Sequence, residues 1–163
     1  MNRSDILVPL NLEKHSLEGL KFASRLSVEL PRRITLLYVV ELNVFPCERR
    51  VYDELCKEHR ERLRVLAQCF FAKQPRLCVR VGKAYQEILG EANDAGTDMI
   101  VMGIPESPRW KWLGGIDTVK RVVRDAPCLT LVLSNSRKIS PDRHHPESSP
   151  SAFAPGQSEL LYR

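Results

Sequence analysis

The chain has 163 residues, 43% hydrophobic and 28% charged, which is enough for one domain with a real core and a tail. The formal net charge is +5 and the pI is about 9.1, a mild basic excess that we attribute to a well-solvated surface. No apolar run is long enough to span a membrane, and the opening MNRSDILVPL lacks the long apolar segment and cleavage site of a signal peptide. We therefore expect a cytoplasmic protein without membrane contact.

The first half of the chain predicts two strands and two helices in alternation. Residues 5–10 (DILVPL) are apolar on both faces, which suits a central parallel strand, and a helix is expected over about 15–28. Residues 33–40 (RITLLYVV) are β-branched and aromatic, and they predict the clearest strand. Residues 48–71 predict a long helix whose charges form a solvated outer face.

The second half continues the alternation. Residues 76–81 alternate apolar side chains with Arg80, which predicts a strand half open to solvent near a sheet edge. The remaining elements are expected at 84–95 (helix, capped by Gly96), 98–103 (strand), 117–124 (helix) and 129–133 (strand).

After residue 134 the composition changes. Residues 135–163 are rich in Pro and Ser, and they predict a disordered tail behind a domain of residues 1–134. Within that domain, five strands alternating with four helices predict an α/β fold, a doubly wound parallel sheet with helices on both faces. Ligands of such sheets bind beyond the carboxyl ends of the strands, which here are Leu10–Asn11, Val40–Glu41, Gly82–Lys83 and Met102–Gly103.

The five cysteines do not indicate a disulfide framework or a metal site. Their number is odd, and no Cys or His pair has the spacing of metal ligands. We predict that Cys56, Cys69, Cys78 and Cys128 are small buried hydrophobic residues and that Cys47 is the one exposed thiol.

Three segments together resemble the universal stress protein family: ILVPLNLEKHSLEGLKFASRLS, VRVGKAYQEILGEANDAGTDMIVMG and VKRVVRDAPCLTLVL. The likeness covers roughly residues 4–134. It implies the strand order 3-2-1-4-5 and a homodimer that pairs along the last strand, with Leu129, Leu131 and Leu133 at the pairing edge.

Many members of that family bind ATP through a loop after the fourth strand, with the pattern Gly, two residues, Gly, nine residues, Gly, then Ser or Thr. Gly103 matches the first position, but Glu106, Ile116 and Asp117 stand at the other three. A phosphate there would meet two carboxylates, at about 1 kcal/mol per charge pair in bulk water and more near protein. The loop ESPRWKWLGG is similar to that of the UspA-type branch, which does not bind ATP.

A nucleotide remains an alternative if the loop shifts and uses Gly114 and Gly115. Asn11 stands where ATP-binding relatives usually carry Asp, and its amide oxygen still accepts a hydrogen bond. For ATP or AMP the resemblance then implies contacts from Pro9, Leu10, Asn11, Val40, Gly82, Met102, Gly103, Gly114, Gly115 and Thr118.

Trp110 and Trp112 have two interpretations. Either one of them packs over the strand ends and fills the space that a nucleotide would take, or they form an exposed anchor for a protein partner. Two side chains at i and i+2 of an extended loop cannot both face inward.

We expect a non-enzymatic stress-response or signalling module that acts as a homodimer through unknown protein partners and needs no firm cofactor. No arranged general base or metal-ligand set accompanies the fold, and His15 and His59 lie on expected helix faces. Basic residues such as Lys120, Arg121 and Arg124 come without a nucleic-acid recognition motif, so we expect no nucleic-acid binding.

Overall fold

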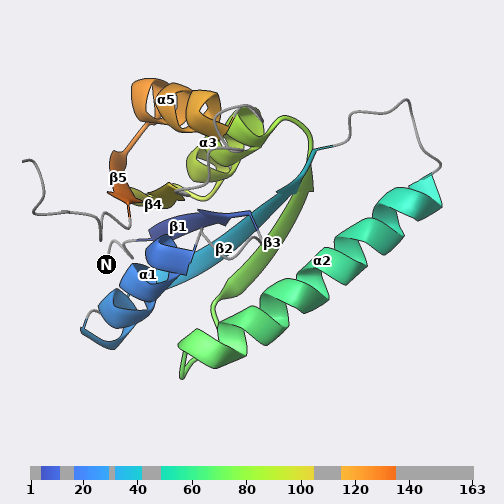
Figure 1. Cartoon of the computed structure of the whole chain (residues 1–163), viewed down its shortest axis with the longest axis horizontal. Coiled ribbons are helices and arrows are strands. Elements are labelled where there is room, and N and C mark those ends of the chain that lie inside the picture. Colours follow the sequence, from blue (N-terminus) through green and yellow to red (C-terminus); the bar gives the residue numbers. More distant parts are fainter. Residues whose placement is uncertain (1–4, 12–16, 30–31, 42–48, 105–114, 135–163) are drawn as a thin grey trace, which may run out of the picture.

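The computed structural model describes residues 5–11, 17–29, 32–41, 49–104 and 115–134. Its five strands form one parallel sheet in the order β3-β2-β1-β4-β5, which confirms the fold class and the expected strand order (Figure 1). The strands are β1 (Asp5–Leu10), β2 (Arg33–Val40), β3 (Arg76–Val81), β4 (Met99–Ile104) and β5 (Leu129–Ser134).

Helices cover both faces of this sheet. The helices over the described residues are α1 (Leu17–Glu29), α2 (Arg49–Phe70), α3 (Ala84–Asp94) and α5 (Gly115–Asp125). α1 and α2 lie on one face, and α3 and α5 lie on the other (Figure 1). The first three strands have the predicted bounds, whereas α5 begins earlier than expected, at Gly115 instead of Asp117. None of the described helices combines the length and the apolar content that crossing a membrane requires.

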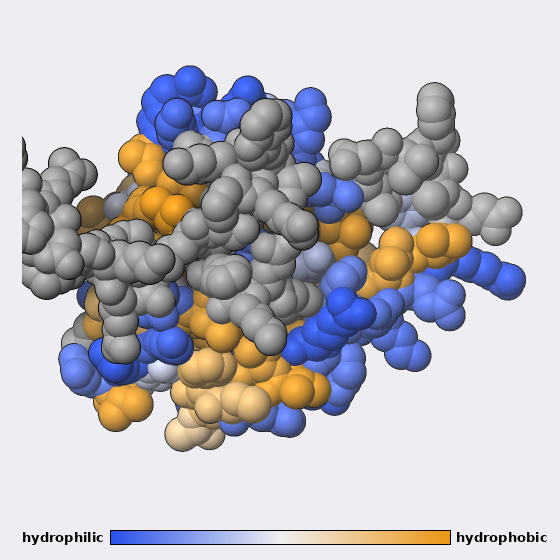
Figure 2. All heavy atoms as spheres, viewed as in Figure 1, coloured by the Kyte–Doolittle hydropathy of each residue, from blue (hydrophilic) through white to orange (hydrophobic). Residues whose placement is uncertain are grey.

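The core consists of two apolar layers that the central strands separate. Along β1, Ile6 and Val8 point toward α1 and α2, whereas Leu7 points toward α3 and α5, and all three are fully buried. A central parallel strand is apolar on both sides for this reason. Figure 2 shows hydrophilic residues (blue) over α5 and along the free side of α2.

A reciprocal pair of hydrogen bonds joins the start of β1 to the residue before β4. The Asp98 backbone N–H donates to the Asp5 carbonyl oxygen at 3.0 Å, and the Asp5 N–H donates to Asp98 Oδ2 at 3.0 Å. These two residues are 93 positions apart in sequence. These two hydrogen bonds therefore hold β1 and β4 together at their amino ends.

The edge position predicted for β3 is confirmed, and residues 77–81 are half-buried, as expected for a strand half open to solvent. Leu77 and Val79 pack toward α1 and α2, while Arg80 lies beneath α3. There its Nε and Nη2 atoms donate to Glu91 Oε2 at 2.7 and 2.6 Å, and Glu91 is only 2% exposed. Arg76 Nη1 lies 2.9 Å from Glu91 Oε1. We call these three residues the Glu91 network.

The prediction for the cysteines is partly wrong. Cys69 is exposed because it lies on the outer side of α2, whose buried residues are Leu63 and Ala67. Cys56, Cys78 and Cys128 are half-buried, and Cys47 lies outside the described residues. Burial raises the pKa of the Cys78 thiol, and the neighbouring Glu91 carboxylate raises it further, so this thiol stays protonated at neutral pH.

Candidate functional site at the carboxyl ends of the strands

The strand order reverses between β1 and β4, and this is where a doubly wound sheet offers a ligand position. β1 and β4 pair at Ile6–Met99 and Leu7–Ile100. The predicted nucleotide residues of both strands lie beyond this ladder, toward the carboxyl ends. Leu10, Val40 and Met102 are buried there, and Pro9, Asn11 and Gly103 are half-buried.

The first turns of α1 pack directly on the backbone at the end of β4. A Cβ atom at Gly19 would lie 3.2 Å from the Gly103 nitrogen and 3.4 Å from the Met102 carbonyl carbon. A Cβ atom there would be closer than most Cβ contacts, so the β4 backbone would have to move by a few tenths of an ångström. Gly19 thus sets the position of α1 beside Gly103. The sequence interpretation missed it, although a glycine inside a helix is costly enough to indicate a packing role.

The ends of β2 and β3 meet the start of α3 in a tight turn. The Gly82 N–H donates to the Val40 carbonyl oxygen at 3.1 Å, and Gly82 has a φ of 155°. Lys83, at the N-cap position of α3, makes no capping hydrogen bond with its side chain. Instead Glu41 Oε1 accepts a hydrogen bond from the Ala84 N–H at 2.7 Å. A carboxylate already binds the amino end of α3, and a negative charge is stabilised there.

A small hollow of about 240 Å³ lies between the first turns of α3 and α5. It brings Asp117 and Thr118 of the motif together with Glu41 and Lys83 from the predicted strand ends. Two carboxylates and two cations share it, so their charges balance. The Arg121 guanidinium carbon lies 4.7 Å from the centre of the Tyr85 ring, a cation–π contact. The lining residues are Glu41, Lys83, Tyr85, Asp117, Thr118 and Arg121.

Several positions that matter for phosphate binding are not placed. Glu106, Trp110, Trp112 and Gly114 lie outside the described residues, so the predictions for them remain predictions. Gly115 is the first residue of α5, and the Ile116 backbone continues that helix. Only Asp117 and Thr118 of the proposed phosphate-binding end therefore have described side chains.

The one histidine among the described residues, His59, packs against an aromatic ring. His59 stacks on Tyr38 with ring centres 4.4 Å apart, and it lies on α2 rather than in the hollow. Burial lowers the pKa of His59, and the nearby Arg62 lowers it further. Among the described residues, no cluster of three His, Cys, Asp or Glu side chains is arranged to hold a metal ion.

The sheet order and the residues at its switch point define a doubly wound α/β protein with a ligand position at the strand ends. The sequence model of the Universal stress protein family matches residues 2–134, and the chain belongs to this family.

Solved structures share the fold at low sequence identity. The universal stress protein UspA from Lactobacillus plantarum is 22% identical with a TM-score of 0.62, and the match covers 82% of this chain and 99% of that one. A universal stress protein from Archaeoglobus fulgidus in complex with dAMP is 16% identical with a TM-score of 0.52, over 81% and 98% of the two chains. A universal stress protein in complex with cAMP is 17% identical with a TM-score of 0.57, over 82% and 98%. The search of curated proteins found no match.

Proposed function

We propose that this universal stress protein is a non-enzymatic module that acts in the cytoplasm as a homodimer through protein partners, with a nucleotide site altered at its phosphate end. The observation that carries the proposal is the position of Asp117 in the first turn of α5. ATP-binding members carry Ser or Thr at this position of the motif.

Carboxylates stand at both helix starts that face the hollow. The amino end of a helix attracts anions because its first N–H groups are unpaired and its dipole is positive there. Glu41 bonds to the first residue of α3, and Asp117 supplies a negative charge at α5. A bound triphosphate would have to displace these two carboxylates or would be repelled by them. This supports a loss of phosphate affinity.

The dimer proposal is supported by the outer strand β5, which pairs with β4 alone in the described sheet. Leu129 is 67% exposed, whereas Leu131 and Leu133 are half-buried against the layer that contains α1. An apolar outer strand with an unpaired edge favours pairing with another chain. Leu129 therefore contributes most of the free apolar surface at this edge.

A second candidate function is the binding of a nucleoside monophosphate. Its supporting observation is that Lys83 and Arg121 line the hollow next to Thr118, so a single phosphate would find two cations beside the carboxylates. Buried Leu10, Val40 and Met102 would then contact the nucleoside. The dAMP and cAMP complexes of the two structural neighbours are consistent with a monophosphate ligand.

Isothermal titration of the full chain with ATP and with AMP distinguishes the two candidate functions. We expect no ATP binding in the micromolar range for the natural chain, and tighter binding, by about tenfold, after Asp117→Ser, because one repulsive charge is removed. Asp53→Ser removes an exposed carboxylate of α2 and serves as the matched control. Low-micromolar ATP binding by the natural chain would refute the altered site, and AMP binding alone would favour the second candidate.

A further inference from the structure

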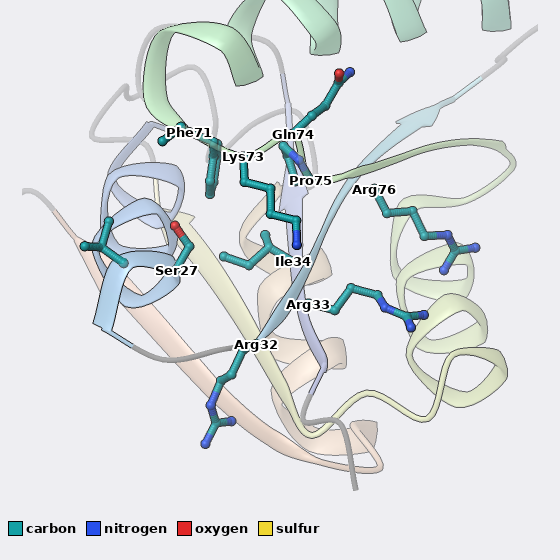
Figure 3. Close-up of a pocket in the computed structure, with 11 residues that line it drawn as sticks. Ser27, Arg32, Arg33, Ile34, Phe71, Lys73, Gln74, Pro75 and Arg76 are labelled. Atoms are coloured by element: carbon teal, nitrogen blue, oxygen red, sulfur yellow. The ribbon is translucent and has the colours of Figure 1, made fainter. Parts of the chain in front are cut away.

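A second hollow lies at the opposite end of the sheet, where β2 and β3 begin. We call it the amino-end groove. It has a volume of about 750 Å³, within the range of small-molecule sites. It lies between the end of α1 and the turn from α2 to β3 (Figure 3). Its described lining consists of Ser27, Val28, Arg32, Arg33, Ile34, Phe71, Ala72, Lys73, Gln74, Pro75 and Arg76.

The groove has apolar surface in two places. Ile34 and Phe71 belong to the core and are 4% and 8% exposed, so they form a rigid base. Val28, near the end of α1, is 83% exposed and leaves a whole apolar side chain in water at the rim. A ligand that covers this valine gains the free energy of removing it from water.

Four basic residues line the groove, and they fall into two pairs. Arg33 and Arg76 are engaged elsewhere: Arg33 Nε lies 3.8 Å from Asp5 Oδ1, and Arg76 binds Glu91. Figure 3 shows both of their guanidinium groups on the same side of the groove, toward a helix. Each of these two guanidinium groups therefore has a carboxylate within salt-bridge distance.

The other pair, Arg32 and Lys73, has no acidic partner among the described residues within salt-bridge distance. The Lys73 side chain extends across the groove toward Ile34, whereas the Arg32 guanidinium points outward from the mouth of the groove (Figure 3). No carboxylate occurs in the described lining. Two cations without counter-charges beside apolar surface match an acid that carries a hydrocarbon body.

We propose that the amino-end groove binds a small amphipathic acid, with a carboxylate or phosphate head on Lys73, reached by Arg32 from the mouth of the groove, and an apolar chain over Ile34, Phe71 and Val28. This site is separate from the carboxyl-end hollow and does not depend on the function proposed for it. A nucleic acid is disfavoured, because backbone binding needs a longer row of cations than these two.

Three probes separate the contributions of head and chain: octanoate carries both, acetate only the head and 1-octanol only the chain. Titration into the isotope-labelled full chain, followed by amide chemical shifts, is expected to show octanoate shifting the amides of residues 27–29, 32–34, 71–74 and 76. Acetate and 1-octanol are expected to bind at least about tenfold more weakly, since each lacks one half of the interaction.

The double variant Arg32→Gln and Lys73→Gln is expected to weaken octanoate binding about tenfold. Val28→Ser should weaken it about threefold without harm to the fold, because that side chain is already exposed. The matched control Lys57→Gln and Arg60→Gln removes two exposed charges of α2 and should leave binding unchanged.

Equal octanoate affinity in the groove double variant and in the control would overturn the proposal. So would acetate binding as tightly as octanoate, which would indicate a simple anion site. The proposal would also be overturned if octanoate changed the amide chemical shifts only of residues outside the groove. Binding of single-stranded oligonucleotide to residues 71–76 in preference to octanoate would favour the nucleic-acid alternative and refute the small acid.

Discussion

The two outer strands of the sheet are held by different forces. β3 carries Arg76 and Arg80, and both bind the buried carboxylate of Glu91 on the strand's own covering helix. β5 is apolar, and its first residue, Leu129, is 67% exposed. An edge whose charges are fixed by its own domain resists pairing with another chain, whereas an apolar edge invites it. We therefore expect a second chain to associate at β5 rather than at β3.

The largest expected effect is at the β3 edge. Glu91→Ala removes the carboxylate shared by two arginines and should lower the free energy of unfolding by about 3 kcal/mol, as for other broken buried ion pairs. Urea unfolding measures this change. The control is Glu58→Ala, whose partner Arg62 is an exposed i,i+4 neighbour, and it should cost less than about 0.5 kcal/mol. Similar losses in both variants would show that the network does not hold β3.

The next effect concerns the β5 edge. Leu129→Arg should weaken the proposed dimer by about tenfold or more, because it adds a charge to the apolar pairing surface. Sedimentation velocity over a range of concentrations measures the dissociation constant. Val65→Arg changes a valine of α2 that is 56% exposed and should leave association unaltered. A natural chain that stays monomeric at high micromolar concentration would contradict the dimer.

The third effect concerns the close packing of α1 on the backbone of β4. Gly19→Ala places a methyl group against the β4 backbone and should destabilise the protein by about 1 kcal/mol in spite of its better helix propensity. Gly90→Ala is the matched control in α3, since its Cβ would contact only the Arg80 side chain at 3.5 Å. It should stabilise by about 0.5–1 kcal/mol. Equal effects of the two substitutions in thermal unfolding would show that Gly19 has no special packing role.

The smallest effect lies at the α2–β2 contact, next to β3. His59 has a pKa below its ordinary value of 6.5 in the folded protein, so the unfolded chain takes up the proton first as the pH falls. Stability should therefore decline as the pH falls through about 6.5 and level off below the folded pKa. His59→Phe keeps an aromatic ring on Tyr38 and should reduce this decline. An unchanged pH profile in urea unfolding would assign the dependence to other groups.

Periodicity and composition were sufficient for the sheet. β1, β2 and β3 have the predicted bounds because each is an uninterrupted apolar or alternating run. The Glu91 network was missed, although its signal is present. Arg76 and Arg80 are four apart on a strand and so share a face, and Glu91 lies three residues after Ile88 on the inner side of a helix. Pairing these two faces requires knowing that α3 covers β3.

The site was predicted less completely, for a physical reason. The residues at strand ends follow from topology, so Leu10, Val40 and Met102 were placed correctly at the carboxyl ends of β1, β2 and β4. Glu41 was not identified as the group that covers α3, because this role depends on a contact across 43 positions of sequence. Cys69 was assigned to the core because an apolar residue type was taken as evidence of an inward position on α2.

The pair of hydrogen bonds between Asp5 and Asp98 has a consequence for biosynthesis. The first strand leaves the ribosome long before its partner, which follows 93 residues later. At roughly 5–20 residues per second the interval is on the order of 5–20 seconds. During that time β1 can pair with β2, but its β4 side stays open. The nascent chain thus carries a temporary apolar edge at its centre, and chaperone binding is expected to be strongest in this interval.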